Sequence, residues 1–189
     1  MNQRIFLPTL MVTCGLFAAC HHAAPLAPGA ADPNDPRTII PDLAKAHKDK
    51  IDFAWYVNSL LRSPDPAIKA FAKTMDTDHK RLLARLTEWA KKADVIIAYA
   101  YAPGLQGTSL KSMEKMQGDL LQSDDNPTFQ RDYLILTWTD LDWQRNLLAA
   151  ALLQTKDPDL KAYLQDSLDT QTKEREACRS LLAKFKWQP

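Results

Sequence analysis

Glycine is scarce in this chain, which has only five glycines among its 189 residues. Leucine, alanine, lysine and glutamine are frequent instead, and these residues have high helix propensity. The length allows one domain of ordinary size with a buried core. The composition therefore predicts an all-α protein with a single folded domain.

The chain also lacks an excess of charge, since 24 basic residues face 23 acidic ones. Proteins that bind nucleic acid usually carry a basic patch or a strong positive charge, so we expect no nucleic acid partner. Gly-rich phosphate loops, Gly-x-Ser-x-Gly elbows and Cys-x-x-Cys pairs are missing as well. The sequence thus indicates binding or envelope support more than catalysis, although it leaves enzymatic activity undecided.

The first twenty residues have the organisation of an export signal. Arg4 supplies a positive charge, and "IFLPTLMVTCGLF" supplies an apolar run that ends in small residues before Cys20. A transmembrane helix needs about 20 apolar residues, and Pro8 interrupts this shorter stretch. The sequence "LFAAC" resembles the lipobox of bacterial lipoproteins. This resemblance implies a signal peptide over residues 1–19, lipid (palmitate among its chains) on Cys20, and anchoring at the periplasmic side of the outer membrane.

Residues 20–40 are expected to form the lipidated cysteine and a Pro/Ala-rich tether. The stretch "HHAAPLAPGAADPNDPRTII" at 21–40 contains four prolines and offers little apolar surface to bury. Removal of the signal peptide would leave only Cys20 and Cys178. An exported domain with one spare cysteine has no disulfide framework.

Helix start signals divide residues 41–189 into four long helices. Asp-Pro at 65–66, Asn-Pro at 126–127 and Asp-Pro at 157–158 each offer a capping side chain followed by proline at the first helical position. We expect helices near 41–62, 66–93, 127–154 and 158–185. Helices of this length suit a four-helix bundle.

The connection between the second and third helices is about thirty residues long. It is expected to carry a short extra helix near 109–121. Its first part, "VIIAYAYA", favours an extended chain that packs along the bundle. An alternative is an exposed apolar contact site for an envelope protein partner, formed by Ile97, Tyr99 and Tyr101.

A histidine occupies a position in the second helix where leucine is usual. Met75, His79, Leu82 and Leu86 follow the alternating spacing of a buried helix face. On the fourth helix, Glu174 lies in a polar gap of the corresponding face. A buried carboxylate without a partner is costly, so we predict a hydrogen-bonded pair between His79 and Glu174.

Metal binding is the second interpretation of this histidine. Asp76 lies one helical turn before His79. Asp76, His79 and Glu174 would then hold a single divalent metal ion, although no cofactor is the first expectation.

Three stretches resemble domain of unknown function 4142, a bacterial ferritin-like family of exported helical proteins. They are "DPAIKAFAKTMDTDHKRLLARLTEWAKKADV", "FQRDYLILTWTDLDWQRNLLAAAL" and "DPDLKAYLQDSLDTQTKEREACRSLL", within residues 45–185. The resemblance implies a ferritin-like four-helix bundle with a long middle connection. In that family a histidine follows an aspartate on the second helix, as His79 follows Asp78. The comparable histidines of the third and fourth helices fall near Leu141 and Glu174, so a dinuclear iron centre is not expected.

Overall fold

The computed structural model describes residues 35–59, 65–97, 99, 111–112, 115 and 126–184. Its elements are a short 3-10 helix, η1 (Pro36–Ile39), and the helices α1 (Ile40–Ser59), α2 (Pro66–Lys92), α4 (Asn126–Gln154) and α5 (Pro158–Leu182). All of them lie in the compact unit that spans residues 31–189. The described part holds four long helices and no strand, which confirms the all-α class. None of its helices combines the length and apolar character needed to cross a membrane.

The predicted helix starts are present at α2 and α5. Asp65 accepts a hydrogen bond from the backbone N–H of Ala67 at 2.7 Å. Asp157 accepts two, from Asp159 N–H at 2.9 Å and from Leu160 N–H at 3.0 Å. These bonds satisfy amide groups that have no partner within the helix. The aspartates therefore fix where both helices begin.

The chain enters the bundle earlier than the expected tether of residues 20–40 implies. Asp35 accepts a hydrogen bond from the backbone N–H of Arg37 at 2.9 Å, and Pro36 opens η1. Ile40 begins α1 and is completely buried. Residues 36–40 are thus helical, because a capped proline start and a core isoleucine favour order over a solvated tether. The expected signal peptide and the remainder of the tether, Cys20 included, lie outside the described residues.

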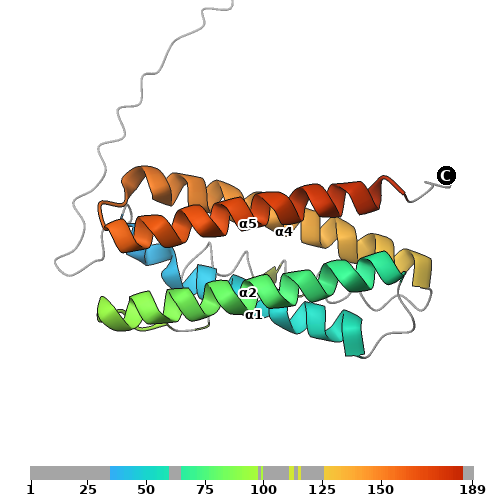
Figure 1. The fold of residues 1–189 in the computed structure, drawn as a ribbon, viewed down its shortest axis with the longest axis horizontal. Coiled ribbons are helices and arrows are strands. Elements are labelled where there is room, and N and C mark those ends of the chain that lie inside the picture. The colour runs from blue at the N-terminus through green and yellow to red at the C-terminus, as the bar shows by residue number, and fades with distance from the viewer. Residues whose placement is uncertain are drawn as a thin grey trace, which may run out of the picture. The chain divides into compact units, whose positions relative to one another are not determined.

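The helices form two antiparallel pairs, α1 with α2 and α4 with α5, and α2 packs against α5 (Figure 1). α1 and α5 run in one direction, whereas α2 and α4 run in the other (Figure 1). Residues 93–125 therefore connect opposite ends of the bundle, which explains the long middle connection. Lys111, Ser112 and Lys115 are helical there. The rest of the expected short helix lies outside the described residues.

Two apolar clusters fill the two ends of the bundle. One cluster joins the starts of α1 and α5 to the ends of α2 and α4. The other joins the ends of α1 and α5 to the starts of α2 and α4. Between them the buried side chains become polar. This polar layer comprises His47, Lys50, His79, Thr137, Gln144, Ser167, Thr170, Gln171 and Glu174. Buried polar groups are costly unless they form hydrogen bonds with one another, so this layer is the candidate functional site of the bundle.

Residues 95–97, directly after α2, belong to no helix or strand, and Val95 N–H donates back to the carbonyl of Ala90 at 2.9 Å. Asp94 has a φ of 53°, a left-handed conformation that aspartate adopts more readily than most residues, and it turns the chain out of the helix. Val95 and Ile97 pack against the first apolar cluster, whereas Ile96 is 86% exposed. Ile97 is therefore partly buried against the bundle. Tyr99 is exposed, and the third expected partner-binding residue, Tyr101, lies outside the described residues.

Candidate functional site

The polar layer contains the predicted pair of His79 and Glu174. His79 projects inward from α2 and is completely buried, and Glu174 projects from α5 and is 4% exposed. His79 Nε2 lies 3.1 Å from Glu174 Oε2, a hydrogen-bond distance. The pair therefore joins the two neighbouring helices at mid-length.

A second histidine, on α1, extends this pair into a chain. His47 Nδ1 lies 2.8 Å from His79 Nδ1, and His47 Nε2 lies 2.7 Å from Tyr163 Oη. The two imidazole rings meet edge-on, with centroids 4.9 Å apart. Tyr163, His47, His79 and Glu174 thus form one continuous hydrogen-bonded chain across three helices. Each neutral imidazole has one N–H donor and one acceptor nitrogen. Fixing the donor at one end of the chain therefore fixes the donor at every other link.

The protonation of Glu174 sets that direction. An ionised Glu174 accepts from His79 Nε2–H, which makes His79 Nδ1 an acceptor for His47 Nδ1–H and leaves His47 Nε2 to accept from the Tyr163 hydroxyl. A protonated Glu174 donates to His79 Nε2 and reverses every link. Either arrangement gives each of the three links one donor and one acceptor while both imidazoles stay neutral.

Burial determines which arrangement holds at neutral pH. Burial raises the pKa of Glu174 to about 8. Burial and the charge of Lys50 lower the pKa of His79 to about 3. Burial, together with the neighbouring His79, also lowers the pKa of His47 well below its ordinary value. These shifts all favour the uncharged forms, so burial favours the arrangement in which both imidazoles are neutral and a protonated Glu174 donates to His79.

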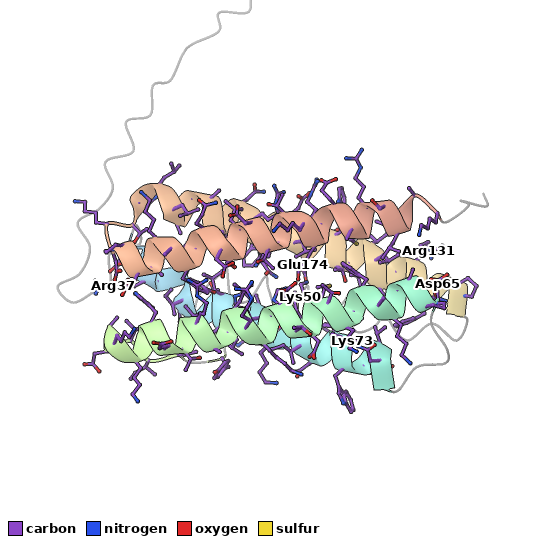
Figure 2. The ribbon with its side chains drawn as sticks, viewed as in Figure 1. Arg37, Lys50, Asp65, Lys73, Arg131 and Glu174 are labelled. Atoms are coloured by element: carbon purple, nitrogen blue, oxygen red, sulfur yellow. The ribbon has the colours of Figure 1, made fainter. Side chains whose placement is uncertain are left out.

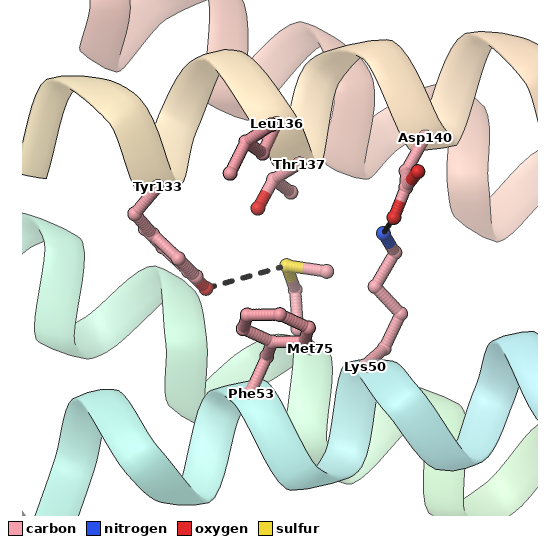
Figure 3. A pocket seen from close by; sticks show the side chains of 7 residues that line it. All are labelled: Lys50, Phe53, Met75, Tyr133, Leu136, Thr137 and Asp140. Carbon is pink, nitrogen blue, oxygen red and sulfur yellow. Dashed lines mark hydrogen bonds and ion pairs between the residues drawn. The ribbon is translucent and has the colours of Figure 1, made fainter. Parts of the chain in front are cut away.

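The polar layer also contains a lysine, Lys50, on the side where α1 faces α4. Lys50 and Glu174 both lie near mid-length of the bundle (Figure 2). Lys50 Nζ on α1 lies 2.6 Å from Asp140 Oδ2 on α4. The two line a cavity of about 10 Å³ together with Met75 and Tyr133 (Figure 3), the size that admits one water molecule at most. This side of the layer is therefore closed to larger ligands.

The α2–α5 side is open. A groove of about 630 Å³ runs between these helices and reaches Glu174. One end is charged, with Asp78, Arg81, Asp166 and Lys173, and the other is mainly apolar, with Ala67, Ala70, Phe71, Ala177 and Leu181. Glu174 Oε1 is buried and has no hydrogen-bond partner among the described residues. One carboxyl oxygen is thus held by His79, while the other is buried and unpaired in a side chain that lines the groove.

Asp76 does not join this site. Its side chain lies 2.7 Å from Lys80 Nζ on the same helix and is 24% exposed. Residues three apart on a helix differ in direction by about 60°, so Asp76 points to the side while His79 points inward. Among the described residues, no group of three or more His, Cys, Asp or Glu side chains is placed to hold a metal ion.

Sequence reasoning missed His47 and Tyr163. His47 follows Leu43 by four residues on a face that also contains Ile40 and Ala54. The same test that identified His79, a polar residue on an apolar face, would have found it. Tyr163 adjoins Leu164 in the core and carried no polar signal of its own.

An all-helical bundle with a buried polar layer is the class that the fold and site define. The chain belongs to the family described as domain of unknown function (DUF4142), whose model matches residues 23–181. This confirms the family resemblance of the sequence. No curated protein sequence matches the chain significantly.

Two solved structures share the fold. A DUF305 fragment from Deinococcus radiodurans aligns with a TM-score of 0.67 and 13% identity, over 82% of this chain and 99% of the fragment. CopM in the Cu(II)-bound form aligns with a TM-score of 0.62 and 14% identity, over 80% of this chain and 97% of CopM. At these identities the likeness concerns the fold alone.

Proposed function

We propose that this protein is a lipid-anchored periplasmic bundle that binds a small ligand in the α2–α5 groove and does not act as a catalyst. The observation that carries the proposal is the buried, unpaired Oε1 of Glu174, whose side chain lines that groove. A buried acceptor without a partner costs about 1–3 kcal/mol. A ligand that donates a hydrogen bond there would remove this cost.

The size and composition of the groove support the proposal. Its volume of about 630 Å³ lies within the range of roughly 300–1,000 Å³ that is usual for small-molecule sites. Such sites combine an apolar lining with a few placed polar groups, as Phe71 and Leu181 do here with Glu174.

Export and anchoring complete the proposal. The signal pattern of residues 1–19, the lipobox cysteine Cys20 and the following proline-rich stretch support attachment to the periplasmic face of the outer membrane. A ferritin-like ancestry is consistent with two helical hairpins joined by an end-to-end connection. An anchored bundle of this kind would present its groove to molecules in the periplasm.

Native mass spectrometry of the untagged protein, purified from the envelope, tests ligand binding. Ala177 lines the groove and is exposed, so Ala177→Leu should fill the groove without disturbing the core. Ala84 is exposed on α2 outside the groove, and Ala84→Leu is the matched control. We expect a small-molecule adduct on the wild type and on Ala84→Leu that is lost from Ala177→Leu. A wild-type protein at its own mass, or an adduct that survives in Ala177→Leu, contradicts the proposal.

Binding of a single metal ion is a second candidate function. Nδ1 atoms of His47 and His79 face each other at 2.8 Å, with Glu174 at the far side of His79. A metal ion takes imidazole nitrogens at about 2.0–2.1 Å, so the two rings would have to separate modestly to admit one. One metal ion per untagged chain by elemental analysis, lost in His47→Ala, would support this candidate over the first, whereas a metal-free protein would reject it.

A further inference from the structure

We infer that the α2–α5 groove binds a small amphiphilic amine, with its ammonium group at Glu174 and its hydrocarbon part along the apolar end. The inference rests on the proposed function and names the ligand class of the same groove.

The unpaired oxygen of Glu174 defines the head group. Oε2 is engaged with His79, and whether Oε2 accepts a proton from Nε2 or donates its own, Oε1 carries no hydrogen and is an acceptor. The head group must therefore be a hydrogen-bond donor. A carboxylate or phosphate has no proton to offer at neutral pH and would place an acceptor against an acceptor.

The charged side chains that line the groove balance one another. Asp78 and Asp166 line it together with Arg81 and Lys173, and burial favours the protonated, neutral form of Glu174. Arg81 is bound to Asp166, which Arg85 also contacts, so this guanidinium is already paired. The choice of an ammonium group therefore rests on its hydrogen-bond donors, of which it offers three.

The apolar end defines the rest of the ligand. Ala67, Ala70 and Ala177 are small residues that leave space between α2 and α5, and Phe71 and Leu181 provide apolar surface. Leu181 lies seven positions after Glu174 on α5, a distance of about 10 Å along the helix. A medium-length alkyl chain fits this distance. If it lies there, affinity should rise about three- to fourfold with each added methylene.

Calorimetric titration of the untagged full chain with n-octylamine, n-butylamine and n-octanoate tests the inference. We expect saturable one-to-one binding of octylamine, at least tenfold weaker binding of butylamine, and none of octanoate. Ala177→Leu should weaken octylamine binding at least tenfold, and Ala84→Leu should leave it unchanged. The lipid-anchored chain is kept in detergent, and partitioning of octylamine into this detergent is the same for the wild type, Ala177→Leu and Ala84→Leu, so it cancels in the comparison. Glu174→Leu, if it folds, should abolish the preference for amine over carboxylate.

The outcomes separate this inference from the proposed function. Octanoate binding as tightly as octylamine, or octylamine binding that Ala177→Leu does not weaken, overturns the amine inference. A native adduct that Ala177→Leu removes would still support a ligand of another class. Absence of both amine binding and any native adduct would overturn the inference and the proposed function together.

Discussion

Replacing His79 by leucine should destabilise the fold through the two partners that it leaves behind. Leucine is apolar but similar in size to histidine, so packing changes little. It leaves His47 Nδ1 and Glu174 Oε2 buried without the partners they now have at 2.8 Å and 3.1 Å. Each buried polar group without a partner costs about 1–3 kcal/mol. We therefore expect a loss of about 2–6 kcal/mol in the free energy of unfolding.

Adding Glu174→Leu should return part of this loss, because it removes one of the two stranded groups. The recovery should be about 1–3 kcal/mol, with His47 still unpaired. Glu176 lies on the same helix, two residues further on, and is exposed. Glu176→Leu added to His79→Leu is therefore the matched control and should return nothing.

Urea unfolding measures these differences. With a slope of roughly 1–3 kcal/mol per molar urea, the His79→Leu midpoint should fall by about 1 M or more. Two results would refute the reasoning: a His79→Leu variant as stable as the wild type, or equal recovery from the Glu174 and Glu176 substitutions. The first would mean that the hydrogen-bonded chain contributes nothing to the fold, and the second that the recovery does not come from removing the stranded carboxyl group.

Three further predictions concern the pH dependence of stability, the helix cap at Asp157 and the lipidation of Cys20. Stability should be greatest near pH 6.5. Between pH 4.5 and 6.5 the unfolded chain binds protons at His47 and His79 that the folded chain does not bind, and these two outweigh the one proton that only the folded chain keeps, at Glu174. Above pH 6.5 the histidines are neutral in both states, and the folded chain alone keeps the Glu174 proton, to about pH 8. Urea unfolding from pH 5 to 8 should show a decline of up to about 1.4 kcal/mol per pH unit above pH 6.5, and Glu174→Gln should abolish that decline. Asp157→Ala removes two capping bonds and the bond from Trp89 Nε1, so thermal melting should report a loss of about 1–3 kcal/mol, and an unchanged melting temperature would contradict the cap. Cys20→Ser should lose labelling by tagged palmitate and leave the membrane fraction, and a variant anchored like the wild type would exclude the lipoprotein interpretation.

Local sequence signals were sufficient for the helix starts and for one buried pair. Asp65 and Asp157 accept hydrogen bonds from backbone amides only two or three residues further along the chain. Local sequence is therefore enough to predict these helix caps. His79 and Glu174 each interrupt an apolar face, and both faces point to the same core. The pairing was therefore a prediction about two helices, and the distance of 3.1 Å confirms it.

The rest of the site depends on the register between helices, which the sequence does not contain. His47 is 32 residues from His79 and 116 residues from Tyr163 in the sequence. Both contacts require that α1, α2 and α5 are aligned along the bundle axis in one particular register. The groove depends on small residues of α2 and α5 facing each other, Ala70 and Ala177 among them. Asp76 has the spacing of a metal ligand but its direction on the helix takes it to Lys80.

The side-chain carboxyl of Glu174 offers the most direct test of the account. A ¹³C NMR titration of this carboxyl carbon reports whether the group is buried at the groove, as ligand binding through Oε1 requires. Because burial raises the pKa of Glu174 to about 8, we predict a titration midpoint near that value. A midpoint near the ordinary value of 4.5 would show a solvated carboxyl and contradict both the buried chain and the proposed site.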